Sequence, residues 1–255
     1  MRNHSTKTSW NITNHSRPKA AWIAGIALLL MAVLAPIAQF GVLDNLIVPE
    51  DASTTISNIV ASPGMFQIAG VAFVIVALLD VVVAWTLHVV LQGVNRVASL
   101  VTASLRTVYA GVLAVATINL FEVTRVANDR ASLGASGLQA EIMGSLRSFH
   151  TGYEEIGLAI FALHLFGLGY LVYQSVDFPK FLGILVVVAG GGYLFDSLGQ
   201  MLTAGFGQSV AQFTFVGEAL LILWLFWRAA KRFPTDKSPD EAIGRRVTRT
   251  ASVTR

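Results

Sequence analysis

Long apolar runs separated by short polar segments occupy most of the chain. A bilayer core about 30 Å thick needs roughly 20 apolar residues at about 1.5 Å of helix rise each. Six runs reach that length, and together they predict an all-α, six-span transmembrane helix bundle spanning residues 20–230. The predicted spans are residues 20–43, 65–91, 97–121, 153–175, 180–203 and 208–229.

The composition agrees with a chain whose main solvent is lipid. Hydrophobic residues make up 54% of the sequence and charged residues only 13%, and a soluble domain of this size carries about twice that charged share. The mean hydropathy is +0.63. The sequence has no cysteine, which excludes disulfides, thiolate metal sites and thiol catalysis.

Lysine and arginine are distributed unevenly between the two sides of the predicted bundle. In the six-span arrangement, fourteen of the 18 fall on the side that holds both termini. The positive-inside rule therefore predicts cytoplasmic tails at residues 1–19 and 231–255, the second basic and disordered. The net charge of +3 follows from this asymmetry and does not indicate nucleic-acid binding. The main partner that the sequence predicts is the lipid bilayer.

Two of the predicted outer loops carry helical patterns of their own. In the first loop Asp51 is a candidate N-cap before Ile56, Ile59 and Val60, and the third loop repeats Leu138, Ile142 and Leu146. Both patterns predict short amphipathic helices. They either lie on the outer membrane surface or pack over the bundle as a lid, since the same pattern serves both arrangements.

Helix-breaking residues inside the runs predict local features. Pro36 should kink the first span, because it lacks an N–H and its ring clashes with the preceding turn. Gly190, Gly191 and Gly192 fall in the middle of the fifth span. They indicate close helix packing, with a hinge or a ligand-lined gap as the alternative.

Two opposite charges are expected to meet inside the bundle. Asp80 and Arg106 lie on consecutive antiparallel spans, and their depths differ by about three residues, roughly 4 to 5 Å. We predict an Asp80–Arg106 ion pair, because an unpaired charge in lipid is costly. It acts either as a structural pin or as a proton or substrate site. His164 is expected to form a hydrogen bond within the bundle.

The outer halves of the last three spans form a second polar group. The candidates for a polar cavity are His150, Tyr153, Glu154, Asp196 and Glu218. Carboxylates that lie close together in a dry site must share protons or attract cations. Histidine and carboxylates also bind divalent metals, but no HExxH spacing is present, so no cofactor is predicted beyond that weak metal signal.

Three stretches carry a family resemblance: IVPEDASTTISNIVASPGMF, LLDVVVAWTLHVVLQGVNR and HTGYEEIGLAIFALHLFGLGYLVYQSVDFPKFLGILVVVAGGGYLFDSL. The chain resembles the bacterial domain-of-unknown-function family 4386 over about residues 20–230. The resemblance rests on Asp80, Val94-Asn95-Arg96, Arg106, the run from Phe161 to Tyr170, Pro179 with Leu182-Gly183, and Gly192-Tyr193. It implies a multi-pass protein of the bacterial inner membrane and supplies no catalytic residues.

The leading functional prediction is a membrane protein that binds or passes a small molecule, lipid or ion through an outward-facing polar cavity. One alternative is a membrane-embedded hydrolase, metal-dependent or not, that uses the carboxylates and His150. Another is an accessory subunit that packs on a membrane-protein partner. The sequence does not decide whether the protein is an enzyme.

Overall fold

The computed structural model describes residues 16–48, 51–128, 135–203, 206, 210–211 and 216–231. Within these residues every regular element is a helix, which agrees with the predicted all-α class. Most of the predicted N-terminal tail, residues 1–15, and nearly all of the predicted C-terminal tail, residues 232–255, lie outside the described ranges.

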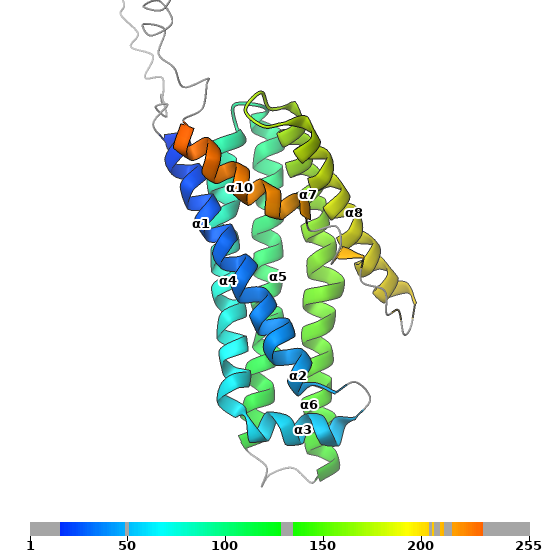
Figure 1. Cartoon of the computed structure of the whole chain (residues 1–255). Coiled ribbons are helices and arrows are strands. Elements are labelled where there is room, and N and C mark those ends of the chain that lie inside the picture. The colour runs from blue at the N-terminus through cyan, green and yellow to red at the C-terminus, as the bar shows by residue number, and fades with distance from the viewer. Residues whose placement is uncertain are drawn as a thin grey trace, which may run out of the picture.

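Long helices run side by side as a bundle, with a short helix lying across one end (Figure 1). In chain order the elements are α1 (Ser16–Pro36), η1 (Ile37–Leu43), α2 (Asp44–Leu46), α3 (Ala52–Ala61), α4 (Pro63–Leu91), α5 (Arg96–Asn128), α6 (Ala135–His150), η2 (Thr151–Gly157), α7 (Leu158–Gln174), α8 (Lys180–Leu202) and α10 (Val216–Lys231). The two η elements are π-helical.

Five helices of the described part are long and apolar enough to cross a membrane, one fewer than the six spans predicted. They cover Ser16–Leu46, Pro63–Leu91, Arg96–Ala127, Ser136–Gln174 and Lys180–Leu202. The sixth predicted span overlaps α10, of which the structure describes 16 residues; residues 212–215 before it and 232–255 after it lie outside the described ranges. α10 packs against α1 and α8, and Figure 1 shows its end beside the first turn of α1.

The helix predicted in the third outer loop continues directly into the fourth span. Residues Ser136–Gln174 form one uninterrupted helix of 39 residues, so α6 extends the fourth span and is not a separate surface helix. The reason lies in its apolar stripe. Ile142 and Leu146 are buried, and α6 packs along α5, which itself extends beyond the predicted span to Asn128.

The first loop does contain a short helix, α3, which lies across the end of the bundle (Figure 1). Asp51 caps it: its Oδ1 accepts a hydrogen bond from the Thr54 N–H at 2.9 Å. Its buried side chains, Thr55 and Ile59, face the ends of α4, α5 and α6. These contacts are compatible with a lid over the bundle, and a place on the outer membrane surface stays a prediction.

Small residues allow α7 and α8 to approach closely. A Cβ built on Gly183 would lie 2.7 Å from the carbonyl oxygen of Gly169, and one built on Gly190 would lie 3.0 Å from the carbonyl oxygen of Ala162. Gly191, by contrast, is exposed and meets no atom within 4 Å. Gly190 therefore serves helix packing, the first of the two interpretations of the triple glycine. Pro36 ends α1, and the π-helical turn of η1 follows it.

Candidate functional site

Asp80 on α4 and Arg106 on α5 lie in contact in the interior of the bundle. Both side chains are buried, with exposed fractions of 0% and 2%. The Arg106 Nε donates to Asp80 Oδ1 at 2.8 Å, and Nη2 lies 2.7 Å from the same oxygen. The predicted Asp80–Arg106 ion pair is thus present, and both contacts use the same carboxylate oxygen of Asp80.

His164 on α7 extends this pair into a three-residue network. Its Nδ1 lies 2.9 Å from the carbonyl oxygen of Thr102, and its Nε2 lies 3.2 Å from the Arg106 Nη1. A carbonyl oxygen only accepts and a guanidinium nitrogen only donates. Nδ1 therefore carries the proton and Nε2 accepts, so His164 is a neutral imidazole with one defined tautomer.

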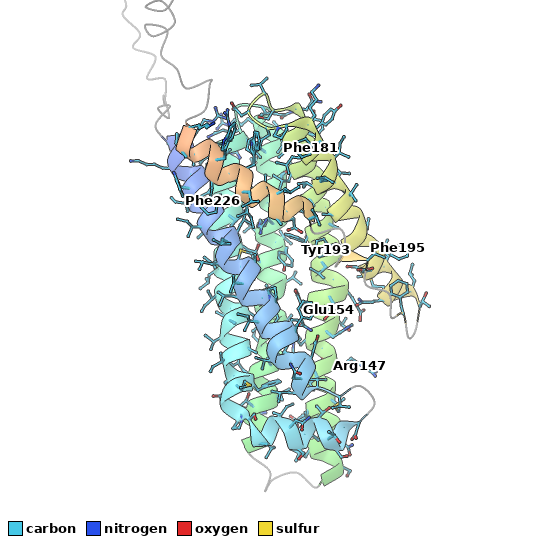
Figure 2. The ribbon with its side chains drawn as sticks, viewed as in Figure 1. Arg147, Glu154, Phe181, Tyr193, Phe195 and Phe226 are labelled. Carbon is cyan, nitrogen blue, oxygen red and sulfur yellow. The ribbon has the colours of Figure 1, made fainter. Side chains whose placement is uncertain are left out.

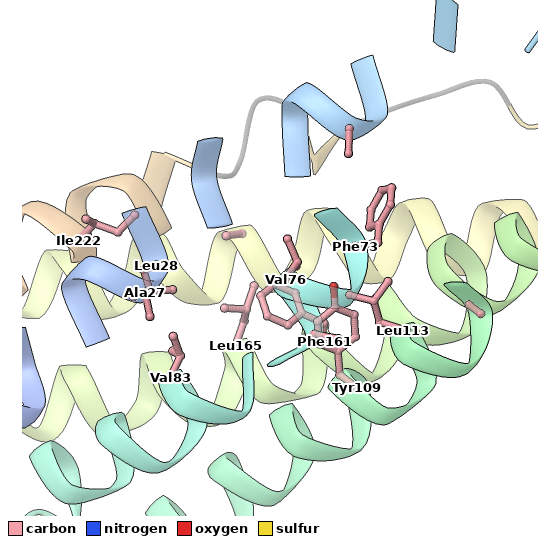
Figure 3. Packing of buried hydrophobic residues seen from close by; sticks show 14 of the residues in the cluster. Ala27, Leu28, Phe73, Val76, Val83, Tyr109, Leu113, Phe161, Leu165 and Ile222 are labelled. Carbon is pink, nitrogen blue, oxygen red and sulfur yellow. The ribbon is translucent and has the colours of Figure 1, made fainter. Parts of the chain in front are cut away.

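A cluster of aromatic rings from α5, α7 and α8 packs against the network. The Arg106 guanidinium carbon lies 5.2 Å from the centre of the Phe161 ring, a cation–π distance. The Phe161 ring also contacts Tyr109 of α5, with centroids 4.9 Å apart, and Tyr193 of α8, at 5.5 Å. Figure 3 shows the Tyr109 and Phe161 rings beside each other with Leu165 nearby. These rings exclude lipid from the charged groups.

Two carboxylate oxygens near this network have no hydrogen-bond partner among the described residues. They are Oδ2 of Asp80 and Oε1 of Glu218, and both atoms are buried. Glu218 lies on the first turn of α10, where the Tyr193 hydroxyl and the Arg106 guanidinium are its electrostatic neighbours. Asp80 is close enough to repel it. The structure thus brings Glu218 toward the ion pair, which the sequence analysis treated as a separate centre.

The other candidates of the outer group divide between two environments. Tyr153 packs its ring against Phe73, with centroids 5.4 Å apart, and is an electrostatic neighbour of Glu218. His150, in contrast, is about half exposed, with Nε2 lying 3.3 Å from Glu154 Oε2 and Nδ1 lying 3.5 Å from Glu155 Oε1. Figure 2 shows Tyr193 and Glu154 at different levels along the bundle.

Asp196 has a local structural role. Its two oxygens accept the backbone N–H groups of Val210 and Ala211 at 2.9 and 2.8 Å. Both carboxylate oxygens are thereby engaged in holding the segment that leads to α10. The polar residues Gln212 and Thr214, which flank Glu218 in sequence, lie outside the described residues.

The described residues contain no group of three or more histidines, cysteines, aspartates or glutamates that could hold a metal ion. His150 and Glu154 approach each other, but Asp196 and Glu218 are directed to other partners. The divalent-metal interpretation of the outer group therefore gains no support from this part of the chain.

A second buried polar centre lies at the opposite end of the bundle from α3. Asp177, in the turn between α7 and α8, accepts Arg17 Nη2 of α1 at 2.8 Å and Arg228 Nη2 of α10 at 2.7 Å. Its carbonyl oxygen accepts the Trp224 Nε1–H at 3.1 Å, and Arg17 also donates to the Val90 carbonyl. The sequence analysis missed this centre. A usable signal was present, because Asp177 is the acid between two predicted spans and Arg17 and Arg228 lie at the ends of other spans on the same predicted side.

Five helices that are long and apolar enough to cross a membrane, with the charged side chains of Asp80 and Arg106 buried between them, indicate a multi-pass membrane protein. The profile of the family described as "Domain of unknown function (DUF4386)" matches residues 23–229, and the chain belongs to this family. An uncharacterized protein of Archaeoglobus fulgidus is 30% identical over 169 residues, which cover 66% of this chain and 87% of that relative. No solved structure matches the chain. Since that relative is archaeal, the family resemblance does not by itself place the protein in a bacterial inner membrane.

Proposed function

We propose that the protein binds a small monovalent cation, or a proton, inside the membrane at the carboxylates of Asp80 and Glu218. The observation that carries this proposal is the Asp80 Oδ2 atom, which is fully buried beside an ion pair and accepts no hydrogen bond from the described residues. A buried acceptor without a donor costs about 1 to 3 kcal/mol, and more when it is charged. A bound cation or proton would offset that cost.

The formal charges of the network support a cationic ligand. Asp80 and Glu218 contribute two negative charges, Arg106 contributes one positive charge, and His164 is neutral in its observed tautomer. One negative charge remains uncompensated among these four groups. An isolated charge inside a bilayer is unfavourable. A ligand with one positive charge would therefore neutralise these four groups.

If the Asp80–Arg106 pair served only to hold two helices together, it would need fewer polar groups around it. A buried ion pair can be replaced by packed apolar residues without loss of stability, so the pair alone is weak evidence for a stabilising role. The network instead adds a histidine, three tyrosines and a second carboxylate from different helices. The π-helical segment η2 places Tyr153 near Glu218, and such segments occur frequently at functional sites.

The binding of a cation or a proton can be measured on the purified protein in lipid nanodiscs. Unfolding midpoints would be recorded in sodium, potassium and ammonium at one ionic strength, and at several pH values in a large organic cation. A ligand at about 100 times its Kd stabilises the native state by about 2.7 kcal/mol. We expect one of these cations, or acidification, to raise the midpoint of the native protein.

Two variants make this test specific. Glu218→Gln keeps the side-chain size and removes the charge, so the cation-dependent or proton-dependent shift should disappear. Glu141→Gln is the matched control, because the Glu141 side chain on α6 is 40% exposed and its charged neighbour is Arg125, not a residue of the network. A shift that persists in Glu218→Gln, or no shift in the native protein, would contradict the proposal.

We also propose the finer topology. The bundle end that holds the start of α1 and the end of α10 carries Arg17, Lys180, Arg228 and Lys231, so the positive-inside rule assigns it to the cytoplasm of a cell membrane. The end of the bundle that carries α3 then faces outward, and His150 lies toward that outer side of the site. We propose that the site opens toward this outer side. No observation in the described residues favours the hydrolase alternative.

A further inference from the structure

An apolar groove lies between α8 and α10 on the surface of the bundle. Its volume is about 350 Å³, and its walls are Phe181, Leu182, Leu220, Leu223, Trp224 and Trp227. That volume falls within the range of about 300 to 1,000 Å³ that is usual for small-ligand sites. Phe181 stands where α8 begins, close to the end of the bundle that carries the basic residues (Figure 2).

The groove is held open by fixed side chains. The Trp224 indole is anchored by its Nε1–H, which donates to the Asp177 carbonyl oxygen at 3.1 Å. The Trp227 ring packs against it with centroids 4.5 Å apart. Trp224 therefore cannot swing into the groove without breaking its own hydrogen bond to Asp177, and the Trp227 ring is packed against it. The walls are therefore preformed for an apolar chain.

Two positive groups lie near the groove: Lys231 beside the lining residue Trp227, and Lys180 next in sequence to the lining residue Phe181. The Lys231 ammonium lies 4.6 Å from the Trp227 ring centre, and the Lys180 ammonium lies 5.4 Å from the Tyr173 ring centre. Both lysines are exposed, so their charges are available to a ligand. In addition, no side chain caps the amino end of α8, whose first N–H groups favour an anion.

We propose that this groove binds an anionic phospholipid, with an acyl chain along Leu220 and Leu223 and the phosphate between Lys180 and Lys231. The charge complementarity selects this occupant, because an apolar partner helix would need no cations at the rim. Aromatic rings and lysines at the membrane boundary are the usual anchors of lipid headgroups. The site is separate from the Asp80 network and does not depend on the function proposed there.

Native mass spectrometry of the detergent-purified protein tests the proposal, with phosphatidylglycerol and phosphatidylcholine titrated in parallel. We expect one phosphatidylglycerol to bind more tightly than phosphatidylcholine. Each lysine near a headgroup contributes about 1 kcal/mol, so Lys180→Gln and Lys231→Gln should each weaken phosphatidylglycerol binding about fivefold. The double variant Arg96→Gln/Arg147→Gln removes two exposed charges that border no part of the groove and should leave binding unchanged.

A groove-filling variant tests the acyl-chain position. Leu223 is 65% exposed, so Leu223→Trp should fold normally while it occupies the groove and reduces binding of both lipids. Leu78→Trp is the matched control, since Leu78 is 64% exposed on α4, outside the groove lining. Equal binding of the two lipids, or phosphatidylglycerol binding that survives both lysine changes, would overturn the proposal. A dimer that Leu223→Trp dissociates, with no bound lipid, would overturn it in favour of a second copy.

Discussion

The Arg228 Nη2 atom lies 2.7 Å from Oδ1 of Asp177, and this contact joins the last described helix to the turn between α7 and α8. The second carboxylate oxygen of Asp177 accepts Arg17 Nη2 of α1 at 2.8 Å. One aspartate thus connects three parts of the chain that are far apart in sequence. This connection holds the last turns of α10 against the start of α1 and the α7–α8 turn.

Asp177→Asn should destabilise the protein substantially. The change removes the charge that neutralises two arginines, of which Arg228 is only 8% exposed. Breaking a buried pair by removing one partner costs about 3 to 5 kcal/mol. Unfolding in a mild detergent, followed by circular dichroism against temperature, would measure this loss. Arg17→Gln should cost less, since Arg17 is 19% exposed, and an equal or larger loss for Arg17→Gln would contradict this ranking.

The intramembrane pair allows a rescue experiment. Arg106→Ala leaves the Asp80 carboxylate buried without its cation, and we expect a loss of about 3 to 5 kcal/mol. Asp80→Asn added to Arg106→Ala removes the uncompensated charge and should recover much of that stability. A double-mutant cycle of unfolding free energies would measure the coupling. An absence of recovery would mean that Arg106 stabilises the bundle mainly through Phe161 and His164.

The α7–α8 contact distinguishes two glycines on the same helix. Gly183→Ala would place a methyl group 2.7 Å from the Gly169 carbonyl oxygen, so the helices must separate, at a cost of about 1 to 3 kcal/mol. Gly191→Ala meets open space and should be neutral or stabilising by about 0.5 to 1 kcal/mol, because alanine favours the helix. Thermal unfolding of the two variants side by side tests this difference in sign.

The cap of α3 should respond to acid. Hydrogen bonds from Thr54 and Ser53 lower the pKa of Asp51 from 3.8 to about 2. Because the folded pKa is the lower one, the stabilisation is fully present above pH 4 or so and is lost as the pH falls through about 2. Protection of the Thr54 amide from hydrogen exchange should therefore fall between these values. Asp51→Asn keeps a capping oxygen without a charge, so its Thr54 protection should not change over this range.

The sequence alone was sufficient for properties that depend on local composition and on distance along one helix. Apolar runs of span length predicted the all-α membrane class, and depth counting placed Asp80 and Arg106 at similar levels. Asp51 was identified as the α3 cap from its position before an apolar repeat. These features follow from the period and rise of a helix, which are the same in every helix.

Other features depended on which helices meet. Neither the packing of α10 on α1 and α8 nor the continuity of α6 with α7 follows from hydropathy, because an apolar segment can either cross the bilayer or pack on the bundle. Asp196 and Glu218 are each the only acidic residue of a predicted span, yet one accepts backbone N–H groups before α10 and the other approaches Asp80. Only the tertiary fold distinguishes these roles, since side-chain partners come from elements distant in the chain.

The sequence by itself therefore determined that this chain forms apolar helices with a few costly charges at known depths. The tertiary structure decided which of those charges meet, how Asp177 joins α1 to α10, and where the groove between α8 and α10 opens. The physical reason is that burial in lipid depends on each segment's own composition. Pairing and cavities instead depend on the relative positions of several helices, which no single segment specifies.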